Sequence, residues 1–151
     1  MLNPLNDGID HINVYSKGRT FLGRRLSNFY PIMFCHPVYG WFDNVEGFYF
    51  FVSTGFKVDA FRRCKGFEAK VLGKAYERVP CDNFESLIRE AIRLKILQNP
   101  VLLKDLKDST LPFKHYYVYG DPNNKYKIIE TKGFDYMMEE IEAVRKEIKN
   151  S

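Results

Sequence analysis

Two stretches of this chain repeat apolar residues at helical spacing, and they constrain the fold more than any other feature. In residues 83–97 one side holds Phe84, Leu87, Ile88, Ala91, Ile92 and Lys95, opposite Arg89, Glu90 and Arg93. Near the C-terminus, one face is lined by Met137, Ile141, Val144 and Ile148. A helix with one apolar face buries that face against other elements. We therefore predict two amphipathic helices on one hydrophobic core.

The neighbouring residues support both helices. The sequence Gln-Asn-Pro at Gln98–Pro100 is expected to end the first helix, because the residue before a proline disfavours helical geometry. The apolar segment Val101–Leu106 then predicts another helical turn or two. In the C-terminal helix, Glu142 and Lys146 form a favourable pair four residues apart.

Strand-forming residues lie between the two helices. His115–Tyr119 and Tyr126–Glu130 are rich in β-branched and aromatic residues, and a Gly-Asp-Pro-Asn-Asn stretch separates them. This pattern predicts a hairpin, and His11–Tyr15 is a candidate for a further strand. We predict an α+β fold, a single mainly helical domain over residues 1–151 with a small antiparallel sheet.

Length and composition favour an intracellular soluble protein. The chain has 151 residues, enough for one core. No apolar run approaches the roughly 20 residues that span a bilayer, so we expect no membrane partner. The cysteines are odd in number and far apart, which favours buried free thiols in the reducing cytoplasm and no metal site; they are Cys35, Cys64 and Cys81.

The positive charge is concentrated in two segments. The net charge is +4; Lys17–Arg25 contains four basic residues and no acid, and Lys57–Lys74 contains six basic residues against two acids. Basic segments of this kind favour a phosphate-bearing partner. A solvated basic face explains the charge equally well, so the pattern leaves both interpretations open.

Glu46 precedes the apolar run Phe48–Val52 and has two interpretations. Asp43-Asn44-Val45-Glu46 has the form of a capping box, with Asp43 at the N-cap, and the same form recurs at Asp82–Glu85. Alternatively, Glu46 is an acid held in a pocket, where loss of solvation raises the pKa of a carboxyl group and suits it to proton transfer. The local pattern favours capping and does not exclude the second role.

Four motifs in order resemble the NADAR (YbiA-like) family, over roughly residues 20–105. They are "FLGRRLSNFYP" (Phe21–Pro31), "NVEGFYFF" (Asn44–Phe51), "AKVLGK" (Ala69–Lys74) and "REAIRLKILQNPVL" (Arg89–Leu102). The form of the second motif is similar to that of tailed-phage members, which implies a bacterial host cytoplasm. The resemblance implies a YbiA-like fold and hydrolysis of N-glycosidic bonds to ribose, without a cofactor.

The resemblance also assigns roles to individual residues. It implies that Glu46 is catalytic, and that other residues contact the ribose, the phosphate or the base: Ser27, Asn28, Arg24, Arg25, Lys70, Lys74 and, as an aromatic wall, Trp41. The implied substrates are phosphorylated ribosyl nucleosides such as riboflavin-pathway intermediates, ADP-ribosyl compounds such as NAD, ADP-ribose itself, and ADP-ribosylated nucleic acid. More ordinary explanations remain open, with Ser27-Asn28 as a turn and both lysines as solvated surface.

One departure from the family pattern bears on the reaction. Family members often carry a lysine seven residues after the glutamate; here that position is Ser53, and the nearest lysine is Lys57. Cleavage of a C1′–N bond gives the sugar oxocarbenium character, which a carboxylate at Glu46 stabilises. Three functions remain open: an N-glycosidase, a nucleotide or ADP-ribose binder with reduced activity, and a protein-interaction module that uses the basic face.

Overall fold

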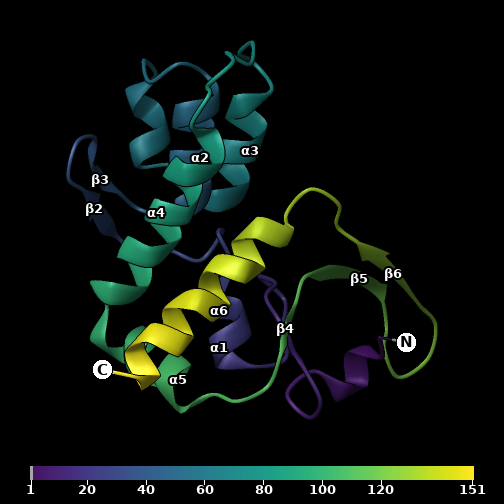
Figure 1. Ribbon diagram of the computed structural model, residues 1–151. Helices are drawn as coiled ribbons and strands as arrows, with labels where there is room; N and C mark the ends of the chain where they lie inside the picture. The colour runs from purple at the N-terminus through teal and green to yellow at the C-terminus, as the bar shows by residue number, and fades with distance from the viewer. Residues whose placement is uncertain (1) are drawn as a thin grey trace.

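The computed structural model describes residues 2–151, and its two longest helices are the two predicted from periodicity. Helix α4 (Phe84–Leu97) packs against helix α6 (Asp135–Lys149) across the middle of the molecule (Figure 1). The predicted apolar faces are buried in one core. Arg93 of α4 joins the two helices by ion pairs to Glu140 and Glu147 of α6. Both helix predictions are confirmed.

Four shorter helices complete the helical part of the described chain: α1 (Phe21–Leu26), α2 (Val45–Ser53), α3 (Gly66–Gly73) and α5 (Pro100–Asp108). Two 3₁₀ turns accompany them, η1 (Pro4–Asn6) and η2 (Asp59–Arg62). Helix α5 begins at Pro100, where the missing N–H costs nothing because the first turn has no intrahelical acceptor. The chain therefore turns directly from α4 into α5, as Gln98–Pro100 predicts.

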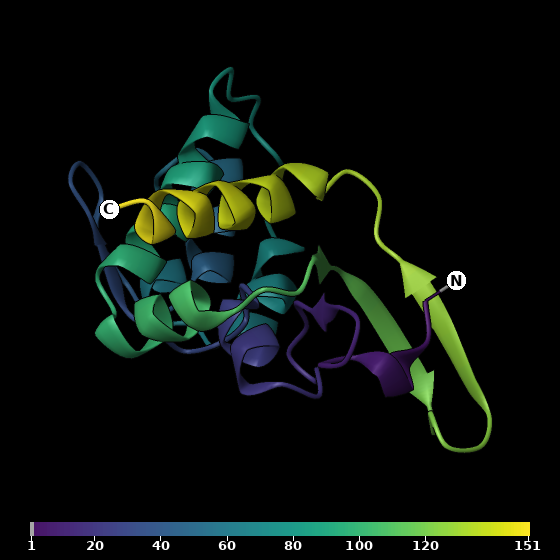
Figure 2. The ribbon, with the colours of Figure 1, turned by 60° about the horizontal axis from the view of Figure 1, so that its bottom comes forward.

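The strands of residues 2–151 form three separate pairs. β5 (Tyr116–Gly120) and β6 (Tyr126–Glu130) form the predicted antiparallel hairpin, which extends away from the helices (Figure 2). β2 (Phe34–His36) and β3 (Gly40–Phe42) form a second antiparallel hairpin that the sequence does not predict. The predicted α+β fold, mainly helical with a small antiparallel sheet, is confirmed.

The N-terminal strand is shorter than predicted and has a distant partner. Only Ile12–Asn13 (β1) is extended, and it pairs in parallel with Phe113–Lys114 (β4). The buried side chain of Asn13 continues this pairing, because it accepts a hydrogen bond from the N–H of Tyr116 and donates one to the Tyr116 carbonyl. Local sequence gives no signal for a contact across about a hundred residues.

Helix α2 lies at the centre of the aromatic core. Its Phe48 and Phe51 pack edge-on against Phe42 of β3. On another side Gly47 touches η2 so closely that a Cβ there would overlap the carbonyl oxygen of Phe61. These contacts fix the position of α2, and therefore of the residues at its N-terminus.

The predicted capping box at Glu46 is wrong. The N-cap is Asn44 and not Asp43; its Oδ1 accepts a hydrogen bond from the N–H of Gly47 at 2.8 Å. Its Nδ2 also donates to the carbonyl oxygen of Cys64 at 2.7 Å, which is a tertiary contact. Glu46 is therefore one position nearer the helix start than predicted, with its own N–H donated to the Asn28 carbonyl.

Three other expectations change in detail. The N-cap of α4 is Asn83, without a side-chain cap, so the box at Asp82–Glu85 is also absent. The cysteines are free but only partly buried. Among the described residues no ion pair joins Glu142 to Lys146; Glu142 accepts a long hydrogen bond of 3.5 Å from the N–H of Phe113.

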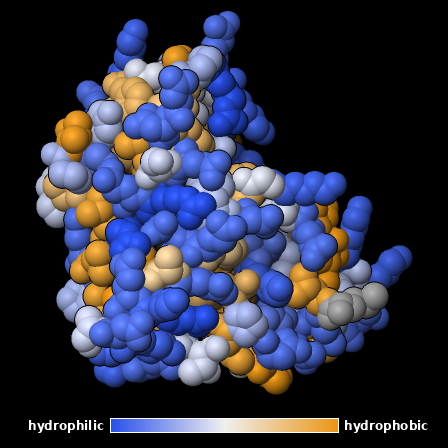
Figure 3. Space-filling model, viewed as in Figure 1, coloured by the Kyte–Doolittle hydropathy of each residue, from blue (hydrophilic) through white to orange (hydrophobic). Residues whose placement is uncertain are grey.

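The surface is mainly polar. Hydrophilic side chains cover most of the face shown in Figure 3, and hydrophobic ones lie between them in small groups. Within residues 2–151 no helix is long and apolar enough to cross a membrane.

Candidate functional site

Six separate segments line a partly open cavity of about 250 Å³ beside the N-terminus of α2. They are the loop after β1, the turn after α1, the first residues of α2, the middle of α3, the strand β5 with His115 before it, and the start of α6. The walls contain both apolar side chains and a few polar groups, which is typical of small-molecule sites. The segments span most of the chain, so the cavity exists only in the folded protein.

Glu46 contributes to this cavity a carboxyl group with a strongly raised pKa. It occupies the second position of α2, and burial raises the pKa of its side chain to about 7, while the nearby positive charge of Lys70 opposes the rise. Both the acid and the carboxylate are therefore populated near neutral pH. A group with this property exchanges protons readily at physiological pH.

The Ser27-Asn28 turn lies directly against Glu46. Ser27 is the C-cap residue of α1, and its Oγ accepts a hydrogen bond from the N–H of Phe29, as the turn interpretation predicts. Asn28 also lines the cavity; its Nδ2 donates to the sulfur of Met137 at 3.3 Å. A thioether is a weak acceptor, so this amide loses little when it turns to a ligand oxygen.

The turn is held from behind by a buried lysine. Lys95 of α4 donates from Nζ to the Ser27 carbonyl oxygen at 2.8 Å, and complete burial lowers the pKa of this amine to about 7. Lys95 does not line the cavity. The N–H of Glu46 donates a hydrogen bond to the next carbonyl, that of Asn28, so two successive carbonyl groups of the turn are fixed.

The structure brings Glu46, Ser27, Asn28 and Lys70 together around one cavity, as the resemblance implies. It places the other predicted site residues elsewhere. Arg24 donates to the carbonyl of Gly18, and Arg25 forms an ion pair with Asp105. Lys74 caps the end of α3 at the surface. Trp41 on β3 is 59% exposed and does not line the cavity.

Sequence reasoning does not find several residues of the wall. These are Val14, Tyr15, Ser16, Lys17, Phe29, Tyr117, Tyr119, Phe134, Met137 and Met138. Tyr117 and Tyr119 had a usable signal, since residues two apart in a strand share one face. The structure also places His115 in the wall, a position that the sequence leaves open.

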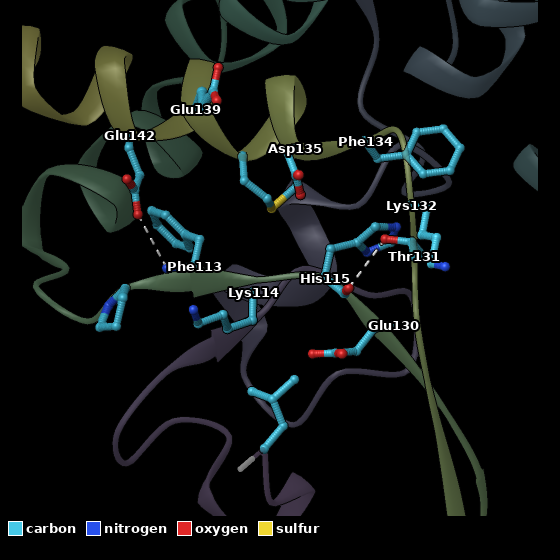
Figure 4. Close-up of a pocket in the computed structure, with 13 residues that line it drawn as sticks. Phe113, Lys114, His115, Glu130, Thr131, Lys132, Phe134, Asp135, Glu139 and Glu142 are labelled. Carbon is cyan, nitrogen blue, oxygen red and sulfur yellow. Dashed lines mark hydrogen bonds between the residues drawn. The ribbon is translucent and has the colours of Figure 1, made fainter.

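A second cavity of about 520 Å³ adjoins the first, between β4, β6 and the start of α6 (Figure 4). His115, Phe134 and Met138 line both cavities and so separate them. The carboxylates of the second cavity all belong to exposed residues: Glu130, Asp135, Glu139 and Glu142. The carboxyl group of Glu46 is half-buried and has a raised pKa, which makes the smaller cavity the better candidate for chemistry.

No metal centre or known relative assists the assignment. Over residues 2–151, no three histidine, cysteine or acidic side chains lie close enough to hold a metal ion. In comparisons with known proteins, no family model, curated protein or solved structure matches this chain.

Proposed function

We propose that this protein is an N-glycosidase that hydrolyses the bond between a base and the ribose of a phosphorylated ribosyl or ADP-ribosyl nucleoside. The observation that carries the proposal is the carboxyl group of Glu46, which lines a partly open cavity and has a pKa raised to about 7. The resemblance to the NADAR family assigns the same residue to the reaction.

The chemistry of the site suits this reaction. As the C1′–N bond breaks, the sugar gains positive charge and the base gains an electron pair. The acid form of Glu46 protonates the leaving base, and its carboxylate form stabilises the positive sugar. Ser27 and Asn28 lie beside Glu46, where they can hydrogen-bond ribose hydroxyl groups.

The remaining wall residues suit a nucleotide. Lys70 and Lys17 supply positive charge for a phosphate group, and Tyr117 and Tyr119 supply aromatic surface for a base. The cavity, at about 250 Å³, is smaller than the ~300–1,000 Å³ typical of sites for drug-sized ligands. We therefore expect it to enclose one ribosyl-base unit, with the rest of a larger substrate, such as a nucleic acid, outside.

A second candidate function is binding of the same ligands without turnover. The position of the family lysine is Ser53, which is buried and bonded to the carbonyl of Phe50, and Lys57 is exposed and outside the cavity wall. A reaction through a lysine at either position is therefore unsupported. A protein that binds ADP-ribose without cleaving it has the same pocket and no need for such a lysine.

The test is a panel of ribosyl N-glycosides incubated with the protein and analysed by chromatography with mass detection. It contains riboflavin-pathway intermediates, NAD, ADP-ribose and ADP-ribosylated guanosine. We expect wild type to release a free base and Glu46→Gln to lose about 100-fold or more of that rate. Glu85→Gln is the matched control, because Glu85 has the same local sequence and is exposed on α4.

The outcomes separate the two functions. Base release that disappears in Glu46→Gln and persists in Glu85→Gln supports the hydrolase. Saturable binding of one compound without turnover supports the binder instead. Wild-type protein that neither cleaves nor binds any compound of the panel contradicts both.

A further inference from the structure

His115 is the one titratable side chain of the described residues that lines both cavities. Figure 4 shows its ring projecting from the start of β5 toward the segment that carries Thr131 and Lys132. Thr131 bonds the His115 carbonyl, and the ring meets the rings of Tyr117 and Phe134 edge-on at centroid distances of 5.5 and 6.2 Å. The imidazole is therefore held in one orientation in the wall beside the Glu46 cavity.

The hydrogen bonds of this ring distinguish its two nitrogens. Nδ1 lies 2.6 Å from the carbonyl oxygen of Val14, which only accepts, so Nδ1 carries the proton. Within residues 2–151 no partner is found for Nε2, and no buried side-chain nitrogen or oxygen lacks a partner. Nε2 therefore reaches accessible space, and in the neutral ring it presents a lone pair there.

Burial keeps this imidazole neutral. It lowers the pKa of His115, an effect that the bond to Val14 opposes in part. The same cause raises the pKa of Glu46. A pair of groups shifted in opposite directions is the arrangement by which a site holds an acid and a base at one pH.

We propose that His115 is the general base of the site and takes a proton from the attacking water through Nε2, which leaves Glu46 as the general acid. This inference rests on the proposed N-glycosidase function. The water oxygen forms the bond to C1′ while the electron pair of the C1′–N bond passes to the nitrogen of the leaving nucleobase. The leaving nitrogen receives the proton of Glu46, His115 holds the proton of the water, and exchange with solvent restores both groups.

The decisive variant is His115→Asn. An asparagine amide occupies the place of Nδ1 and keeps the donor to Val14, but it has no basic nitrogen at the place of Nε2. With a compound that wild type cleaves, we expect kcat to fall by about 10²–10⁴-fold with KM nearly unchanged. In His115→Ala, added imidazole is expected to restore part of the rate, which a purely structural role does not predict.

Other outcomes overturn the inference. Turnover by His115→Asn within about threefold of wild type would show that His115 is not the general base, and would leave the proposed role of Glu46 intact. If wild type cleaves no compound of the panel, the proposed N-glycosidase function is contradicted, and so is the proposed role of His115 as general base. If His115→Asn does not fold, long-range ¹H–¹⁵N spectra of wild type decide: a proton on Nδ1 supports the inference, and a neutral ring with its proton on Nε2 contradicts it.

Discussion

Helices α2 and α4 begin with nearly the same four residues and differ in what those residues do. Asp43-Asn44-Val45-Glu46 precedes α2, and Asp82-Asn83-Phe84-Glu85 precedes α4. Both helices start at the third residue, so an asparagine is the N-cap in each case. At α2 the asparagine is buried and caps the helix, and the glutamate lines a cavity; at α4 both side chains are exposed.

The difference lies in what packs against each helix start. Asn44 is held between the N–H of Gly47 and the carbonyl of Cys64. The Asn83 side chain does not cap α4, and its Oδ1 accepts a hydrogen bond from the thiol of Cys81, two residues away. Nearly the same local sequence therefore serves as a tertiary anchor beside a carboxyl group that lines a cavity in one helix, and as a solvated start in the other.

The largest expected difference between the two starts concerns the asparagines. Asn44→Ala removes the cap and leaves the half-buried Cys64 carbonyl without the amide that donates to it, so we expect the free energy of unfolding to fall by about 2–4 kcal/mol. Asn83→Ala should change it by less than about 0.5 kcal/mol, as an exposed substitution. Urea unfolding of both variants measures these changes, provided that the slope of the free energy of unfolding against urea concentration stays the same. Equal losses would show that the two starts are equivalent.

A smaller difference is expected one residue after each glutamate. A Cβ at Gly47 would overlap the carbonyl of Phe61, whereas Ser86 is exposed. We expect Gly47→Ala to lower the free energy of unfolding by about 1–3 kcal/mol, because α2 must move away from η2. Ser86→Ala should stay within about 0.5 kcal/mol of wild type. Thermal and urea unfolding test the pair, and a stable Gly47→Ala would mean that the contact adjusts easily.

The smallest expected effect is a pH dependence at Glu46. The pKa rises from 4.5 unfolded to about 7 folded, so the folded state binds more protons between these values and wild-type stability falls as pH rises through them. Glu46→Gln lacks this term. Between pH 4.5 and pH 8, the free energy of unfolding of Glu46→Gln should therefore rise by roughly 1–2 kcal/mol relative to that of wild type. This is less than the whole pKa difference would give, because the side chain partly meets solvent.

The control for this measurement is Glu85→Gln, whose stability relative to wild type should change little over the same pH range because Glu85 is exposed. The free energy of unfolding is measured in urea at several pH values. A flat difference between Glu46→Gln and wild type would show that Glu46 is well solvated, and would weaken its proposed role as a proton donor.

Local periodicity was enough to predict the two long helices and the C-terminal hairpin. The apolar stripes of α4 and α6 specify helices wherever they pack, and β-branched and aromatic runs around a Gly-Asp-Pro-Asn-Asn loop specify the β5–β6 hairpin. These signals lie within one segment, so no knowledge of distant contacts is needed. They suffice for the α+β class.

The roles of individual polar groups, in contrast, depend on contacts between distant segments. Asn44 displaces Asp43 as the cap because Cys64 lies beside it, and Lys95 is read from periodicity as part of an apolar face but holds the carbonyl of Ser27. His115 joins Glu46 at one cavity although about seventy residues separate them. Burial and solvation depend on all the segments that surround a group, and it is loss of solvation that sets the pKa values on which the proposed chemistry depends.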